Sequence, residues 1–161
     1  MHLRTKSSKS IGAWGEIPGA RVQITMLEQY LTKLSEELQL DPLLPKDETN
    51  LFHLGVSPTL TLTFKELEKG LFFSGRIAEC PAEKREDLFI LLSRANFLGQ
   101  GTRGGSISLD NDEKFLTLSL HIPYDINYKT FKETVEDFVN YIDYWREELI
   151  RHKQTSKSIL E

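Results

Sequence analysis

The chain has 161 residues, with 24 acidic and 20 basic side chains and a formal net charge of −4. That length suits one domain, which can bury a sizeable core without disulfides or metals. The acidic balance argues against nucleic acid as a partner, because clustered Lys and Arg drive such binding. The single cysteine, Cys80, excludes an internal disulfide and fits a reducing cytosol. No apolar run approaches the ~20 residues that cross a membrane, so we expect no membrane insertion.

The first predicted helix begins after Thr25. Thr25 and Glu28 form a capping-box pattern, in which two side chains satisfy free backbone N–H groups at a helix start. An apolar stripe at helical spacing follows, and Asp41-Pro42 ends the helix. The stripe consists of Leu27, Tyr30, Leu31, Leu34 and Leu38.

Three strands are predicted next, at Leu51–Val56, Thr59–Phe64 and Leu71–Ala78. A charged turn over residues 66–70 separates the last two. In the third strand, Phe72 falls on the face opposite Leu71, Phe73 and Ile77. Phe72 is therefore either covered by a loop or left as an apolar contact for a partner.

The second predicted helix has Pro81 in its first turn and is apolar nearly all round. Its stripe is Leu88, Leu91, Leu92 and Ala95, while Phe89, Ile90, Phe97 and Leu98 lie off that stripe. Such a helix must be covered on more than one side. One cover is its own core, and the other could be a second copy of the chain.

Four glycines within seven positions then predict a helix C-cap and a bend, at Gly99, Gly101, Gly104 and Gly105. Two further strands follow at 106–109 and 116–122, joined by an acidic turn. Asn127 can cap a third helix that runs to about Ile150, with one continuous apolar seam lying across the sheet. The seam consists of Phe131, Val135, Phe138, Ile142, Trp145 and Leu149.

These elements predict an α+β fold of order α-β-β-β-α-β-β-α, with three helices packed on a twisted, mainly antiparallel five-stranded sheet. We place the domain at residues 25–150. Residues 151–161 are predicted to form a polar, frayed tail. Residues 1–24 are predicted to form a flexible arm, since the stretch from Ser7 to Ala20 is rich in Ser, Gly and Pro. The alternative is that Trp14 and Ile17 pack onto a hydrophobic surface of a dimer of this chain.

Residues 88–124 also carry a resemblance to a known family. The run Ala95-Asn96-Phe97-Leu98-Gly99, then Thr102 and Gly104-Gly105, leads into a short strand, an acidic turn and a leucine-rich strand. This pattern resembles the signature of the class I type III secretion chaperones, the Tir-chaperone or CesT-type family. Arg103, between Thr102 and the glycine pair, departs from it, and the N-terminal extension is long for the family.

The resemblance implies a homodimeric, non-enzymatic chaperone of the bacterial cytosol that uses no cofactor. It would bind the N-terminal segment of one or more secreted effectors and keep it extended, soluble and competent for secretion. The secretion ATPase is a further candidate partner. For the dimer interface we name Leu88, Phe89, Leu92, Phe97 and Ile107. For effector binding we name Leu31, Leu34, Leu62, Phe72 and Phe73. For both sets the alternative is a place in the monomer core.

Two other functions stay open. One is a non-catalytic dimeric scaffold or regulatory protein that binds a folded partner. The other is an enzyme that uses the glycine turn, because residues 99–104 match GxGxxG by the letter. That motif needs a strand before it and a helix after it, whereas the predicted order here is the reverse. The four histidines are scattered and no CxxC occurs, which gives a metal site little support.

Overall fold

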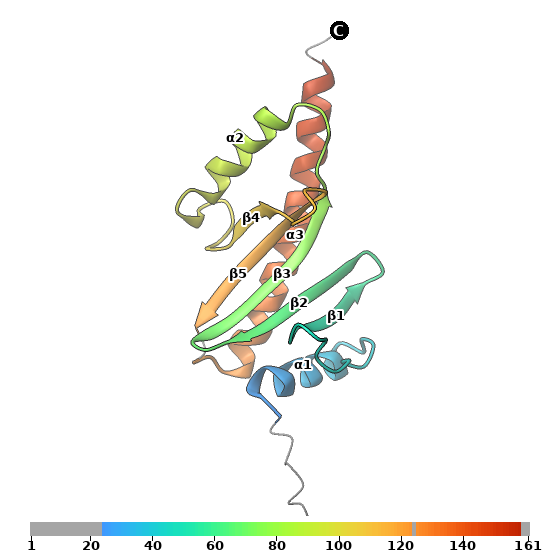
Figure 1. Cartoon of the computed structure of the whole chain (residues 1–161), viewed down its shortest axis with the longest axis vertical. Helices are drawn as coiled ribbons and strands as arrows, with labels where there is room; N and C mark the ends of the chain where they lie inside the picture. Colours follow the sequence, from blue (N-terminus) through green and yellow to red (C-terminus); the bar gives the residue numbers. More distant parts are fainter. Residues whose placement is uncertain (1–23, 124, 159–161) are drawn as a thin grey trace, which may run out of the picture.

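The computed structural model of the chain describes residues 24–123 and 125–158. The order of helices and strands is the predicted one, and Figure 1 shows their arrangement. The elements are α1 (Met26–Glu37), β1 (Phe52–Ser57), β2 (Leu60–Leu67), β3 (Gly70–Glu79), α2 (Arg85–Asn96), the 3₁₀ turn η1 (Phe97–Gly99), β4 (Ser106–Leu109), β5 (Phe115–Pro123) and α3 (Tyr128–Ser158).

The five strands form one sheet in the order β1-β2-β3-β5-β4, and every pairing is antiparallel. The predicted α+β fold is therefore confirmed. β1 and β4 are the edge strands, and each has one row of main-chain groups without a strand partner in the sheet. Along the strands, buried and more exposed residues alternate, as expected when helices cover one face only.

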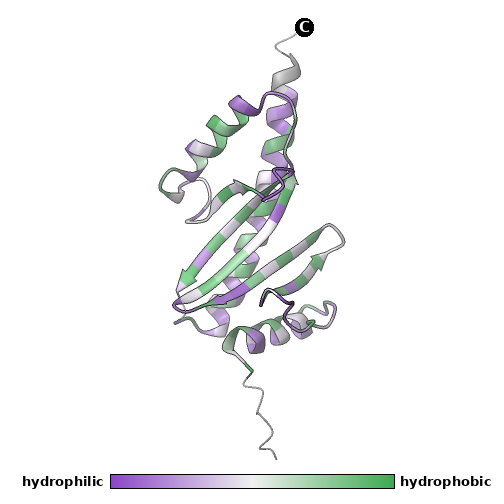
Figure 2. Cartoon of the chain, viewed as in Figure 1, coloured by the Kyte–Doolittle hydropathy of each residue, from purple (hydrophilic) through white to green (hydrophobic). Residues whose placement is uncertain are grey.

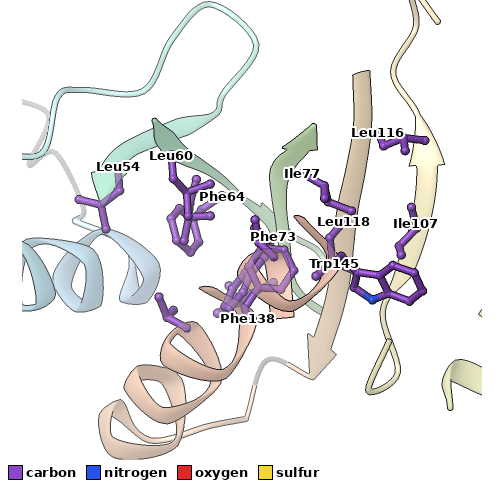
Figure 3. Close-up of a cluster of buried hydrophobic side chains, with 14 of the residues drawn as sticks. Leu54, Leu60, Phe64, Phe73, Ile77, Ile107, Leu116, Leu118, Phe138 and Trp145 are labelled. Carbon is purple, nitrogen blue, oxygen red and sulfur yellow. The ribbon is translucent and has the colours of Figure 1, made fainter. Parts of the chain in front are cut away.

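The long helix α3 lies along the sheet and supplies much of the core (Figure 1). All six residues of its predicted seam are buried. At the centre, the Phe73 ring of β3 lies 4.9 Å from Phe64, 5.7 Å from Phe131 and 6.0 Å from Phe138, between ring centroids. Figure 3 shows Phe73 among these core side chains. Edge-on aromatic packing of this kind adds about 0.5–1.5 kcal/mol per pair beyond the area buried.

Gly75 lets α3 approach β3 closely. A Cβ added at this position would lie 2.5 Å from Ile142 Cδ1 and 2.9 Å from Leu62 Cδ2. Any side chain larger than hydrogen would therefore push against both the helix and the neighbouring strand. Gly55, in the edge strand β1, has no atom within 4 Å of an added Cβ.

Arg146 of α3 ties the helix to irregular backbone at the end of the sheet. The register of β3 against β5 shifts between Arg76 and Ala78, so Ile77 is the extra residue of a bulge. The Arg146 guanidinium donates hydrogen bonds to the carbonyl oxygens of Ile77 (2.9 Å) and Thr59 (3.1 Å). One side chain thus satisfies backbone acceptors from the bulge and from the β1–β2 turn.

Besides the end of α1, which comes at Glu37 and not at Asp41-Pro42, three predicted boundaries are wrong. β2 continues to Leu67, because Leu67 pairs with Gly70 across a tight turn. α2 begins at Arg85, so Pro81 lies before the helix rather than in its first turn; the N-cap residue, Lys84, has a φ of +52° and makes no capping bond.

The third difference is at the end of α3, which runs to Ser158 instead of about Ile150. Buried Leu149 anchors this part, and Arg151 pairs with Glu147 and Glu148 on the helix surface. The domain limits 25–150 and 151–161 stay predictions. The arm of 1–24, apart from Ile24, lies outside the described residues.

We expect Gly75→Val to lower the free energy of unfolding by about 1–3 kcal/mol, because the new side chain overpacks the contact between α3 and β3. Gly55→Val is the matched control, in a strand position with open space, and should leave stability unchanged or slightly raised. Urea unfolding followed by circular dichroism measures both. Equal stability of the two variants would contradict the close approach at Gly75.

Candidate functional site

The glycine-rich turn after α2 is a compact structure stabilised by the chain itself. Gly99 and Gly104 have φ values of +65° and +84°, which glycine adopts at little cost. The Gly104 amide donates to the Gly99 carbonyl at 3.0 Å, and the Thr102 hydroxyl donates to the Gly105 carbonyl at 2.6 Å. The turn follows a helix and precedes a strand, so it does not present a helix N-terminus to a phosphate.

Two side chains, one from α2 and one from α3, fix this turn in place. The Asn96 amide at the end of α2 exchanges two hydrogen bonds of 2.8 Å with the main chain of Ile107 in β4. Trp145 of α3 donates its indole N–H to the Gly101 carbonyl at 3.1 Å. α2 is thereby held against both the edge strand and the long helix.

Arg103, the departure from the family signature, has a structural role. Its guanidinium donates to the Tyr141 hydroxyl at 3.0 Å and to the Asp137 carboxylate at 3.2 Å, and it lies 5.3 Å from the centre of the Tyr141 ring. Both partners are on α3. Arg103 therefore adds a polar contact between the turn and α3 without entering the core.

The first candidate binding surface lies on α2 and η1. We call it the α2 surface and define it by four exposed apolar residues: Phe89 (37% exposed), Ile90 (51%), Phe97 (66%) and Leu98 (78%). In Figure 2, hydrophobic residues colour α2 along much of its length. Contiguous apolar area of this kind on a small protein commonly marks an interface.

The predicted dimer residues divide into two groups. Leu88, Leu92 and Ile107 are buried in the core of their own chain, whereas Phe89 and Phe97 belong to the α2 surface. Ile90 and Leu98 also belong to the α2 surface, but they were not predicted as interface residues. Their position off the helical stripe was the sequence signal that could have identified them. The dimer assignment of all five residues stays a prediction.

The second candidate surface is a hollow of about 320 Å³ between α1, β1 and α3. We call it the α1–α3 groove. Its lining is almost entirely apolar, and Leu38 at the end of α1 is 43% exposed. The groove lies beside β1, whose outer edge has no partner strand. The lining residues are Leu34, Leu38, Leu40, Leu54, Val56, Val135, Glu136, Val139 and Asn140.

The groove has one charged residue in its lining, and an ion pair joins α1 to α3 at residues close to the lining residues in sequence. Glu136 lines it, and Glu37 at the end of α1 accepts a 3.0 Å hydrogen bond from Lys132 of α3. That bond lowers the pKa of the Glu37 carboxyl and raises the pKa of the Lys132 ammonium. Burial raises the pKa of the nearby Tyr128 phenol to about 12, and Glu37 adds to the shift.

Of the five predicted effector-binding residues, Leu31, Leu34, Leu62 and Phe73 are fully buried in the core. Leu34 also lines the α1–α3 groove. Phe72 is half-buried on the other face of the sheet, paired with Lys65 and His121 of the neighbouring strands. The structure therefore does not bring the five together on one accessible surface, and their role in effector binding stays a prediction.

Apart from Leu34, no residue that lines the groove was predicted to bind an effector. Helical and strand periodicity identify residues that face the core, but they cannot show where two core-facing elements separate at the surface.

No group of three or more His, Cys, Asp or Glu in the described part of the chain could hold a metal ion. Within residues 24–123 and 125–158, no helix combines the length and the apolar content that spanning a membrane requires.

We expect Asn96→Ala to loosen α2 from β4, because the two hydrogen bonds to Ile107 disappear and leave a backbone donor and acceptor unpaired. The free energy of unfolding should fall by about 1–3 kcal/mol. Amide hydrogen exchange at Ile107 should become faster. Asn111→Ala, in the exposed β4–β5 turn, is the control; an identical exchange rate at Ile107 in both variants would contradict the anchoring role.

Several solved structures share this fold at low sequence identity. The ExsC–ExsE complex superposes with a TM-score of 0.64 and 15% identity, covering 78% of this chain and 94% of that one. The HopA1–SchA chaperone–effector complex gives 0.57 and 18%, covering 75% and 93%. YbjN from E. coli, described as a putative transcription regulator, gives 0.55 and 14%, covering 79% and 90%.

These similarities show the fold alone. No curated protein matches the chain at a significant level. The family model of the Tir chaperone protein (CesT) family, however, matches residues 29–146. Because this match spans well over half of the sequence and includes the anchored glycine turn, the chain belongs to the Tir chaperone protein (CesT) family.

Proposed function

We propose that this protein is a type III secretion chaperone that binds the N-terminal segment of one or more effectors in the bacterial cytosol. It keeps that segment extended, soluble and competent for secretion, without catalysis. The observation that carries the proposal is the apolar α1–α3 groove beside a free edge strand, in a chain of the CesT family.

The groove suits an extended peptide for two physical reasons. The outer edge of β1 offers main-chain donors and acceptors, and adding a strand there would satisfy both chains. The leucines and valines of the groove offer pockets for alternate side chains. Gly55, near the middle of β1, has open space around it and lets a peptide backbone come close.

Effector capture also explains why the protein tolerates exposed apolar surface. The net charge of −4 keeps the chain soluble in spite of it. The proposed assembly is a homodimer in which the α2 surface of one chain meets that of a second, so that Phe89, Ile90, Phe97 and Leu98 become buried. The secretion ATPase is a further proposed partner.

A second candidate function is a non-catalytic regulator that binds a folded partner. The likeness of the fold to YbjN, described as a putative transcription regulator, favours this alternative. The two functions differ in the state of the bound partner. A chaperone holds its partner unfolded, and a regulator binds it as a globular domain.

Native complexes separate these functions. Partners recovered with the protein from its own cytosol are identified by mass spectrometry, and an N-terminal fragment of ~50–100 residues is then co-expressed with the chaperone. We expect the fragment to be soluble only in the complex and to be digested rapidly by protease once released. A fragment that stays globular and protease-resistant by itself would favour the regulator.

Leu38→Asp should abolish recovery of that fragment, because it places a charge at the mouth of the groove. Leu67→Asp is the matched control, since Leu67 is similarly exposed (36%) but lies at the β2–β3 turn. Both variants should fold, as circular dichroism would show. Equal capture by the two variants would remove the groove from the proposal.

Ile90→Asp should convert the dimer to a monomer without unfolding it, because the introduced charge would be buried unpaired in the interface. Ile150→Asp, at a similarly exposed isoleucine of α3 (55% against 51%), should leave the dimer intact. Sedimentation velocity measures both. A dimer that survives Ile90→Asp would place the interface elsewhere.

A further inference from the structure

The N-terminal arm and the rest of the chain carry opposite charge. Residues 1–23 contain four basic side chains, Arg4, Lys6, Lys9 and Arg21, and one acidic side chain, Glu16. The remainder therefore carries 16 basic and 23 acidic side chains, which gives the arm a net charge of +3 and the remainder −7. Attraction between the two is favourable at physiological salt over separations of about 8 Å or less.

The charge of each hollow distinguishes where a basic segment fits. The α1–α3 groove has Glu136 as the one charged residue of its lining. It also adjoins the C-terminal end of α1, where the helix dipole is negative and the last turn has no basic residue. The hollow beside the glycine turn is lined by Arg103 and its partner Asp137, which balance, and the one near the C-terminal half of α3 has Arg146 and Lys153 against Glu79.

The length of the arm matches the position of this groove. The described chain starts at Ile24, next to the N-terminal end of α1, and the groove lies at the other end of that helix, at Leu34 and Leu38. The 12 residues of α1 span about 18 Å, which an extended chain covers in about six residues. A chain that ran back extended along α1 from residue 24 would reach the groove at about Ile17 and Pro18.

The arm's apolar residues lie at that distance. Ile17 and Trp14 are separated by Gly15 and Glu16, so both fall within about 10 Å of extended chain. A hollow of about 320 Å³ lies in the size range of pockets that hold small ligands, and it can accept large side chains. Ile24 itself is 56% exposed, so the start of the described chain does not direct the arm into the core.

We propose that Trp14–Ile17 of the arm occupies the α1–α3 groove of its own chain when no effector is bound. The regulatory consequence rests on the proposed function, because an effector segment must then displace the arm. The arm shields an apolar groove in the free protein and lowers the apparent affinity for effectors by the fraction of time that it occupies the groove. The one charge within Trp14–Ile17 is Glu16, so the attraction to the groove comes from Lys9 and Arg21 on either side of the segment, and such weak contacts suit a segment that must be released.

Disulfide trapping in the full chain tests this placement. In a Cys80→Ser background, Ile17→Cys is combined with Leu38→Cys, and in the control with Leu67→Cys. Both target leucines are comparably exposed, and Figure 1 shows the β2–β3 turn at the same end of the molecule as α1. We expect the intramolecular disulfide of the Leu38→Cys pair to form at least tenfold faster, as read from non-reducing gels and intact mass.

A charge reversal gives an independent readout. Lys9→Glu combined with Arg21→Glu should slow trapping of the Leu38→Cys pair severalfold, because these residues carry the positive charge beside the segment. Lys69→Glu combined with Lys129→Glu, outside the groove lining, should not. Equal trapping rates for the two target leucines, or a product that links two chains, would overturn docking within one chain. No effector is present, so such a failure leaves effector capture intact. The proposed function is tested separately, by whether the Leu38→Asp variant still captures the effector fragment.

Discussion

The contact between α3 and the sheet is the one on which the other elements depend. Phe73 lies in the middle of it, with rings from β2 and α3 around it, and Gly75 two residues later lets the helix come close. Because α3 is 31 residues long, it extends past the sheet and supplies a wall for other elements at both ends. α1 packs near its start through Tyr30, whose hydroxyl donates to the Ile126 carbonyl, and the glycine turn packs near its middle through Trp145.

In this arrangement one face of α2 packs against the core and the opposite face is left exposed. Asn96 and Trp145 hold the turn firmly, so α2 cannot rotate to bury Phe89 and Ile90 without breaking hydrogen bonds to Ile107 and Gly101. The exposed residues are thus a consequence of a rigid connection and not of a loose helix. A twofold-symmetric contact between two copies would bury the same patch on both, which is the most common way in which soluble proteins cover such a surface.

The sequence predicted the fold because its periodicities are strong. The α3 seam, the alternation in β2 and the glycines after α2 each specify one local structure, and all agree with one architecture. Pro81 misled the prediction of the α2 start, since proline is tolerated before a helix as well as inside its first turn. The residues of the candidate binding groove were harder to predict from the sequence. Leu34 and Leu38 belong to one stripe, yet Leu34 is buried and Leu38 is 43% exposed, because α1 ends at Glu37 and Leu38 is its C-cap residue. Periodicity identifies a face, and only tertiary packing shows where that face ends.

The two candidate surfaces lie at opposite ends of the molecule, with α2 at one end and α1 at the other (Figure 1). A dimer formed through α2 therefore leaves both α1–α3 grooves open. An extended effector segment of ~50 residues can span ~165 Å, more than three times the ~46 Å length of α3, the longest element of the chain. Once the first groove is filled, the second contact is intramolecular, and its effective concentration can reach the millimolar range. In the docking proposed above, each chain's own arm would occupy one groove alone. A segment that bridges two grooves can therefore displace two weakly held arms, even if its contacts in each groove are no stronger than theirs.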